Sequence, residues 1–188
     1  MVHKGTVTLE TERLILRRFV IDDLIPMYFN CLNDKEVWKW TGYHVMNCIE
    51  DVVNNEKLFT EKWLGAYQNP DHYNWSIVLK SSGEPVGRLR GMHPDDRVSQ
   101  VELTYEIGRR WWNQGYTTEA VKKVIDFFFR EVGFNRIYAV HASGNPASGR
   151  VMQKCGMVYE GTLRQAHKCN NGLFDDVRYS ILAEEYFR

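Results

Sequence analysis

Residues 105–120, YEIGRRWWNQGYTTEA, decide the fold of this 188-residue chain. The stretch begins inside the segment 101–107 (VELTYEI), whose strict alternation of apolar and polar side chains predicts a β-strand. A short polar connection follows, and a long helix opens near Gly115. Its apolar side chains recur every three or four residues up to Val132, and Gly133 is its expected C-cap.

The start of this helix has the properties of a phosphate site. Several backbone N–H groups at a helix N-terminus have no partner inside the helix, and the peptide dipoles add partial positive charge there. A pyrophosphate meets both demands, and Gly115 would let it approach the backbone closely. The segment lacks the Gly-Lys-Ser/Thr of a Walker loop and the glycine triplet of a dinucleotide-binding loop. A helix that opens with a glycine is more often plain architecture, so this pattern alone does not decide the function.

The rest of the chain alternates between strands and helices. We expect helices at 24–32, 48–67 and 145–155, and strands at 13–19, 73–80, 86–92, 136–142, 158–169 and 173–182, the last two joined by an Asn-Asn-Gly turn. No repeat or linker interrupts this order. The sequence therefore predicts a single domain over residues 1–188, with a core of about 9–182. Its class is α/β (α+β), a mixed sheet with helices on both faces.

Composition excludes several classes of function. The 24 basic and 24 acidic side chains cancel, which leaves no electrostatic footprint for nucleic acid or an anionic membrane. No run of about 18 apolar residues could span a bilayer, and residues 1–5 lack the apolar core of a signal peptide. We therefore expect a cytoplasmic protein with no nucleic-acid or membrane partner. The four cysteines form no Cys-x-x-Cys pair, and we expect free thiols and no metal.

Three ordered blocks give the sequence a family resemblance. They are residues 102–120, which end in WNQGYTTEA, residues 145–157 (NPAS through KCGM), and residues 160–164 (EGTLR). The chain resembles the GCN5-related N-acetyltransferases (GNAT), and among them the RimJ/RimL-like ribosomal-protein N-terminal acetyltransferases. The likeness runs from about residue 9, where LETERLILR resembles the usual first strand, to about residue 182. It implies a twisted mixed sheet of about seven strands with a splayed central pair.

The resemblance also implies the activity. The protein would be an acyltransferase that moves the acetyl group of acetyl-CoA, its co-substrate, to a primary amine without a metal. The foremost acceptor is a protein or peptide N-terminal α-amine. Two alternatives stay open: acetylation of a small-molecule amine (an antibiotic, a polyamine or an amino-acid conjugate), or a catalytically silent acyl-CoA-binding module. Family resemblance further suggests a homodimer.

The same resemblance implies where acetyl-CoA binds. The pyrophosphate is expected over the helix start, and the pantetheine arm between the splayed strands, where a backbone N–H near Tyr105 to Ile107 is the usual oxyanion donor. Asn145 resembles the residue that binds the arm, although its position also fits a helix N-cap. The expected cofactor-binding residues are Tyr105, Ile107, Asn113, Gln114, Gly115, Tyr116, Thr117, Thr118, Asn145 and Lys154. Thr117 departs from the family's small residue.

Three residues are candidates for the chemistry. Ser148 matches a serine placed near the thioester sulfur, and an exposed helix serine is its alternative. His167 stands where some related enzymes carry a glutamate proposed as base, and an imidazole suits proton removal near neutral pH; a partly exposed strand histidine is its alternative. Glu102 matches the family's strand glutamate or is a charge on the sheet face. A water chain without a single base is also open.

Other positions bear on the site less directly. Met152 stands where many family members carry a tyrosine, so a tyrosine acid is not available there. His141 is expected to be structural. Four aromatic residues could shape the acceptor pocket, but aromatics at such spacing more often belong to the core. They are Trp38, Trp40, Tyr43 and Trp75.

Overall fold

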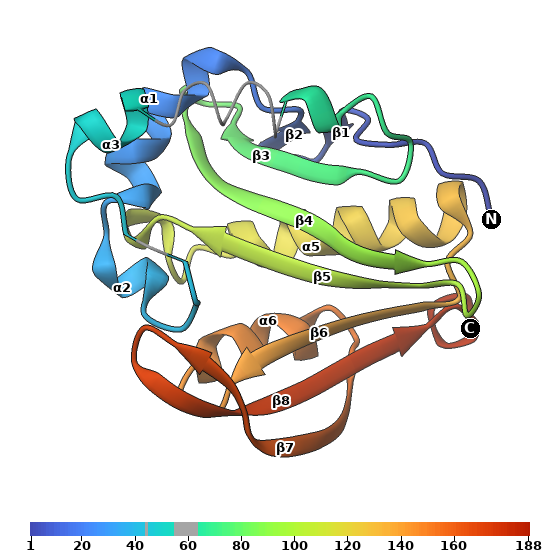
Figure 1. Cartoon of the computed structure of the whole chain (residues 1–188). Coiled ribbons are helices and arrows are strands. Elements are labelled where there is room, and N and C mark those ends of the chain that lie inside the picture. The colour runs from blue at the N-terminus through green and yellow to red at the C-terminus, as the bar shows by residue number, and fades with distance from the viewer. Residues whose placement is uncertain (44, 55–63) are drawn as a thin grey trace.

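A computed structural model describes residues 1–43, 45–54 and 64–188 (Figure 1). These residues form one mixed sheet in the order β1-β2-β3-β4-β5-β6-β8-β7. The strands are β1 (Leu9–Glu10), β2 (Leu14–Arg17), β3 (Tyr73–Leu79), β4 (Pro85–Asp95), β5 (Gln100–Ile107), β6 (Arg136–Ala142), β7 (Val158–Cys169) and β8 (Gly172–Leu182). The predicted mixed sheet is confirmed. The two-residue β1 makes it eight strands rather than about seven.

The helices are shorter and more varied than the periodicity predicts. They are the 3₁₀ turns η1 (Ile21–Asp23) and η4 (Arg109–Trp111), the π-helical turns η2 (Tyr28–Leu32) and η5 (Phe128–Val132), and the α-helices α1 (Leu24–Met27), α2 (Lys35–Trp38), α3 (Ile49–Asn54), α5 (Tyr116–Phe127), α6 (Pro146–Lys154) and α7 (Ala183–Tyr186). Of the helix expected at 48–67, α3 is observed and residues 55–63 lie outside the described residues. Within the described ranges, no helix combines the length and apolar character needed to cross a bilayer.

The central strands β5 and β6 diverge, as expected. They pair in parallel only from Gln100↔Arg136 to Glu102↔Tyr138. On its other edge β5 stays paired with β4 as far as Gly87↔Ile107. Alternate residues of a strand direct their N–H and C=O groups toward opposite neighbours, so part of the backbone from Leu103 to Ile107 faces the opening. Figure 1 shows the opening widening toward α2.

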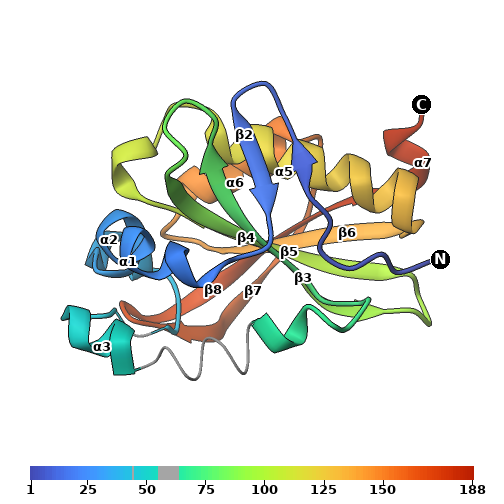
Figure 2. The same ribbon diagram turned by 90° about the horizontal axis from the view of Figure 1, so that it is seen from above.

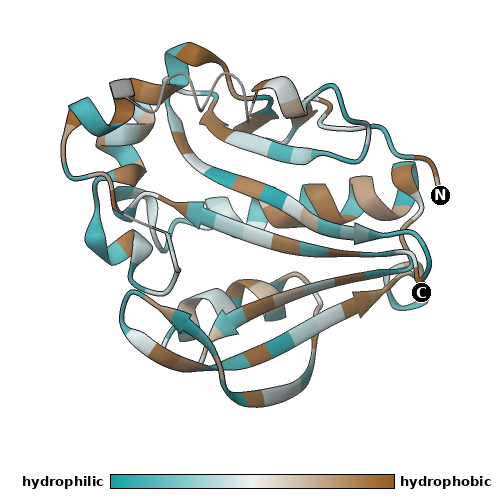
Figure 3. Cartoon of the chain, in the orientation of Figure 1, coloured by the Kyte–Doolittle hydropathy of each residue, from teal (hydrophilic) through white to brown (hydrophobic). Residues whose placement is uncertain are grey.

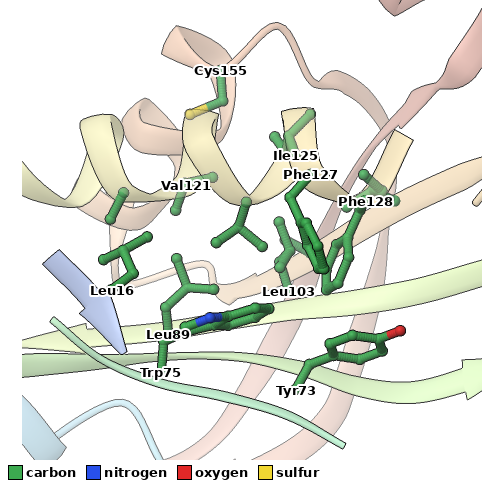
Figure 4. Close-up of a cluster of buried hydrophobic side chains, with 14 of the residues drawn as sticks. Leu16, Tyr73, Trp75, Leu89, Leu103, Val121, Ile125, Phe127, Phe128 and Cys155 are labelled. Atoms are coloured by element: carbon green, nitrogen blue, oxygen red, sulfur yellow. The ribbon is translucent and has the colours of Figure 1, made fainter. Parts of the chain in front are cut away.

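The main core lies between the sheet and α5. Trp75, Leu89 and Leu103 point from β3, β4 and β5 toward Val121 and Phe128, and all five side chains are buried (Figure 4). Figure 3 shows the alternation of apolar and polar residues along the strands that makes this possible. Trp75 therefore belongs to the core and not to the acceptor site.

A second, smaller core lies beside the first helices. Trp38 packs there with Phe19, Met27, Cys31 and Tyr67, and its indole N–H donates to the Cys31 carbonyl. Trp38 is thus also a core residue. Helices α1 and η2 contact β4, while α5 and α6 lie on the other side of the sheet (Figure 2). Helices therefore cover both faces, as the sequence predicts.

Candidate active site

The loop before α5 is built to expose backbone N–H groups. Gly115, the N-cap, has φ +84°, and Asn113 has φ +60°. The first helical hydrogen bond runs from the Glu119 N–H to the Gly115 carbonyl, 3.0 Å away, and in the part of the chain that the structure describes no side chain caps the helix. The N–H groups of residues 116–118 thus lie free at the positive end of the helix dipole. Residues 113–115 are exposed, so this loop fits the pyrophosphate of a CoA ester.

Arg13 fixes the shape of that loop. Its Nε donates to Glu119 at 2.7 Å and its Nη1 donates to the Gln114 carbonyl at 3.1 Å. Its guanidinium also lies 4.3 Å from the centre of the Tyr116 ring. Burial raises the pKa of Glu119, but hydrogen bonds from Thr11 and Arg13 outweigh that effect and lower it overall. The sequence analysis quotes Arg13 only as part of the first strand and assigns it no part in the site.

The end of α6 lies beside the same loop. The Cys155 thiol is 3.7 Å from the Thr118 carbonyl. Lys154, the preceding residue, is exposed at the last turn of α6. A contact of its ammonium group with the phosphates of a CoA ester stays a prediction.

A tyrosine hydroxyl crosses from β5 to α6. The Tyr105 hydroxyl donates to the Ser148 carbonyl at 3.0 Å and accepts from the Ser148 Oγ at 3.1 Å. Burial raises the pKa of Tyr105, with an opposing contribution from the Ser148 hydrogen bond, so the phenol keeps its proton at neutral pH. The structure thus brings Tyr105 and Ser148 together. The Tyr105 hydroxyl therefore lies at Ser148, about one helical turn before the buried Met152, whose side chain has no hydroxyl group.

Asn145 and His141 hold α6 in place. The Asn145 side chain accepts a 3.4 Å hydrogen bond from the Ser148 N–H, so its N-cap position is confirmed. The Asn145 contact with the pantetheine arm stays a prediction. A Cβ added to Gly149 would lie 2.6 Å from the His141 Nε2, and the His141 ring stacks on Tyr179. His141 therefore packs the helix against the sheet, as expected.

The face of the sheet opposite α5 is polar. We call it the polar face; its residues are Arg88, Arg90, Glu102, Thr104, Glu106, Asp176 and Arg178. Glu106 forms an ion pair with the buried Arg88, and its other oxygen is 3.8 Å from Arg90. The Arg90 Nη1 donates to the Tyr43 hydroxyl at 3.1 Å. Tyr43 therefore borders this face, and its part in an acceptor pocket stays a prediction.

Two of the candidate bases lie together on this side. His167 on β7 is hydrogen-bonded through Nδ1 to Asp176 at 2.7 Å. Burial raises the pKa of Glu102, while the charges of His93, His167, Arg178 and Arg90 oppose that rise. His167 and Glu102 are thus close enough to interact electrostatically. Tyr105 lies three residues after Glu102 on the same strand, so its side chain and Ser148 are on the opposite face.

A short segment closes the wide end of the opening. Asn170, at the β7–β8 turn, donates to the Trp38 carbonyl at 3.0 Å and to the Tyr43 carbonyl at 2.7 Å, and its N–H donates to the Thr41 carbonyl at 2.9 Å. The Trp40 ring packs so closely on Gly144 that a Cβ there would collide with it. Residues 38–43 therefore bridge the β7–β8 hairpin and the start of α6.

Comparison with known proteins agrees with this geometry. The family model for the acetyltransferase (GNAT) domain matches residues 13–158. An uncharacterised N-acetyltransferase of Bacillus subtilis (strain 168), YoaA, is 33% identical over 175 residues, which cover 93% of this chain and 96% of the relative. The putative ribosomal N-acetyltransferase YdaF of the same organism is 34% identical over 157 residues, covering 73% and 85%.

A solved structure supports the same fold. It is the microcin C7 self-immunity acetyltransferase MccE in complex with acetyl-CoA and AMP. It superposes with a TM-score of 0.76 at 20% identity and covers 92% of this chain and 93% of its own. At this identity the likeness concerns the fold alone.

Proposed function

Because this chain belongs to the GNAT acetyltransferase family and is an acetyl-CoA-dependent N-acetyltransferase, we propose that its acceptor is the α-amine of a protein or peptide N-terminus. The relative YdaF, named as a putative ribosomal N-acetyltransferase, supports a RimJ/RimL-like assignment. An α-amine has an ordinary pKa near 8 and a lysine amine one near 10.4, so the α-amine is much easier to deprotonate at neutral pH.

The observation that supports this proposal is a set of buried hydrogen-bond donors and acceptors on the polar face that lack partners among the described residues. Counting only the residues that the structure describes, four buried side-chain atoms there have no hydrogen-bond partner: the Nε atoms of Arg90 and Arg178, the Thr104 hydroxyl and one Asp176 oxygen. Buried polar groups without partners cost free energy, which a bound polar molecule would recover. A peptide N-terminus offers carbonyl oxygens for the arginine donors and an amine for the carboxylates.

Each expected cofactor residue has a part in this proposal. Acetyl-CoA, when bound, supplies the acetyl thioester. The N–H groups of Tyr116, Thr117 and Thr118, with the exposed loop residues Asn113, Gln114 and Gly115, would hold the pyrophosphate, and Lys154 would face the phosphates. Asn145 and the backbone between Tyr105 and Ile107 would hold the pantetheine arm. The Tyr105 and Ser148 hydroxyls would lie beside the sulfur.

His167 is the proposed base. Its side chain is 60% exposed, so an acceptor amine has access to it. Its Nδ1 is hydrogen-bonded to Asp176, which leaves Nε2 to take the proton.

Replacing His167 with alanine should lower kcat by roughly 100-fold, the usual contribution of a general base. Lys168→Ala, which changes the adjacent exposed residue on the same strand, is the matched control. Ser148→Ala should cost less, because water can replace a hydroxyl. If His167→Ala keeps wild-type turnover, Glu102 or a water chain takes the role.

The acceptor class is tested with paired substrates. A peptide with a free N-terminus and one internal lysine is incubated with acetyl-CoA, beside the same peptide with a blocked N-terminus and beside a panel of small amines. Mass spectrometry should locate the acetyl group on the α-amine of the first peptide and find the blocked peptide unmodified. Turnover of small amines alone would refute the acceptor proposal and favour the small-molecule alternative.

Two further expectations accompany this function. The family resemblance favours a homodimer, and light scattering at micromolar concentration tests it. The four free cysteines are typical of a reducing compartment, and we propose a cytoplasmic location. Cell fractionation with an antibody against the protein tests the location.

A further inference from the structure

Asp176 is a buried carboxylate with few partners. Its side chain is 0% exposed. One oxygen is 2.7 Å from the His167 Nδ1, and the other is 3.5 Å from the Arg178 Nη2, too far for a good hydrogen bond. A buried carboxylate is costly unless hydrogen bonds and opposite charges compensate it. An exposed imidazole is thus the hydrogen-bond partner of a fully buried charge.

The register of the β7–β8 hairpin brings this pair together. The hairpin register runs regularly from Cys169↔Gly172 to His167↔Phe174, and then Leu163 lies opposite Asp176. The extra residues between Leu163 and His167 bulge outward, with Gln165 at φ +48°. The Gln165 N–H donates to the Asp175 carboxylate at 2.8 Å, which holds the bulge. His167 pairs with Phe174, two residues before Asp176 on β8, so its ring and the Asp176 carboxylate lie on the same face within hydrogen-bond reach.

We infer that Asp176 is a positioning residue, which keeps the proton of neutral His167 on Nδ1 and leaves the lone pair of Nε2 directed away from the sheet for an acceptor amine. A carboxylate can only accept, so the nitrogen that faces it must carry the hydrogen. The same negative charge stabilises the imidazolium that forms when Nε2 takes a proton.

The pair would act in the transfer of the acetyl group from the thioester to the acceptor amine. As the amine nitrogen bonds to the thioester carbonyl carbon, the C–S bond breaks and the sulfur leaves as a thiolate. The proton that the nitrogen gives up moves to Nε2 of His167 and is later returned to solvent or to the thiolate. Asp176 gains no proton and breaks no bond. This inference rests on the proposed function, in which His167 is the base.

The groups around His167 do not offer a rival partner for Nδ1. Phe174 packs at 5.9 Å from ring centre to ring centre and cannot accept a proton. The charged or titratable groups on this side include Glu102 on β5, Arg178 on β8, and Arg90 and His93 on β4, together with Arg88, Glu106 and Tyr138. Among the described residues, the side chain hydrogen-bonded to His167 is that of Asp176.

The first experiment reads the tautomer without any turnover. Nitrogen-15 NMR of the histidine side chains at pH 8 should show His167 protonated on Nδ1 and bare on Nε2 in the wild-type protein. Asp176→Asn, whose amide can also donate, should reduce that population, and Asp71→Asn should leave it unchanged. Asp71 is the control because it is an exposed carboxylate outside the β7–β8 hairpin. A wild-type His167 protonated on Nε2 would overturn the inference even if the variants fail to fold.

The second experiment asks whether Asp176 acts through His167. In the wild-type background, Asp176→Asn should lower kcat at least about 10-fold with the KM for acetyl-CoA unchanged, and Asp176→Glu should recover part of it. In the His167→Ala background, the same Asp176→Asn change should have less than about a 2-fold effect, because the two residues act as a unit.

The outcomes separate the two proposals. Equal losses from Asp176→Asn in both backgrounds would show that Asp176 acts independently and would overturn the inference alone. Wild-type turnover in His167→Ala would remove the base assignment itself. A protein that turns over no peptide but shows the Nδ1 tautomer would contradict the acceptor proposal and leave the pairing intact.

Discussion

The two faces of the central sheet differ completely, although the same strands supply both. On β4, Leu89 points into the apolar core while its neighbours Arg88 and Arg90 point to the polar face. On β5, Leu103 does the same between Glu102 and Thr104. One face therefore stabilises the fold, and the other holds buried charges, which we propose take part in the chemistry. Substitutions at neighbouring positions of one strand should consequently affect different properties, the stability of the fold on one face and binding or turnover on the other.

The largest effect is expected on the apolar face. Phe128 is fully buried and packs edge-on against Tyr73 with ring centres 4.9 Å apart. Phe128→Ala should lower the free energy of unfolding by about 3–5 kcal/mol, through lost burial and the cavity left behind. Denaturant titration measures it. The control is Phe29→Ala, an exposed phenylalanine, which should change stability by no more than about 0.5 kcal/mol. A similar loss in both variants would show that the apolar face is not what stabilises the fold.

The next effect tests whether the polar face also supports the fold. Glu106→Gln removes the carboxylate that faces the buried Arg88. Burial lowers the pKa of Arg88, and the negative charge of Glu106 opposes that effect. Breaking a buried ion pair from one side should cost about 3 kcal/mol of unfolding free energy. The control Glu131→Gln removes a surface pair with Lys4 and should cost at most about 1 kcal/mol. Loss of peptide turnover with unchanged stability would mean that Glu106 serves the acceptor only.

A third change should affect binding and leave the core intact. Gly115→Val puts a branched side chain at φ +84° in the loop before α5, beside Arg13. Affinity for CoA should fall by about 1–3 kcal/mol, because the side chain excludes phosphate and shifts the N–H groups. Calorimetric titration measures it. Gly83→Val is the control, since Gly83 has φ +73° in an open turn, so it shares the backbone strain without the site. Equal affinities in the two variants would refute the phosphate site.

The smallest effect depends on pH. Burial raises the pKa of Glu102, so the native protein binds more protons there than the unfolded chain does. The contribution of Glu102 to stability is thus present below its ordinary pKa and is lost as pH rises through the raised value. Glu102→Gln should match the wild type near pH 4 and be the more stable of the two at pH 7. Unfolding titrations at both values test this, and a wild type that is more stable at pH 7 would contradict the expected direction.

Local pattern was enough to predict the elements that carry the fold. The alternation of residues 101–107 and the three- and four-residue spacing after Gly115 correspond to β5 and to α5 with η5. These patterns are readable because one face of each element is buried. The turn at Asn170-Asn171 was predicted for the same kind of reason, since its residue types favour a tight hairpin.

The parts of the site that depend on register were not predictable. Asp176 stands beside Asp175 in the sequence, and nothing local tells which of them is buried. The register of β8 against β6 decides it, because Asp176, opposite Ala142, faces the polar face and its neighbour Asp175 faces the other side. The Tyr105 hydroxyl was missed in the same way, because its partner Ser148 lies 43 residues further along the chain. The sequence does not distinguish Trp38 and Trp75, which belong to the cores, from Trp40, which packs on Gly144. Only the packing in the folded structure distinguishes them.

The hydrogen bonds of Asn170 have a practical consequence for redesign. They tie the turn of the β7–β8 hairpin to residues 38–43, so two segments more than 120 residues apart in the chain form one surface. Transplanting residues 38–43 from a relative would replace one half of that surface and leave the other unmatched. An exchange of acceptor preference between such enzymes should therefore succeed as a graft of both segments and fail as a graft of either alone.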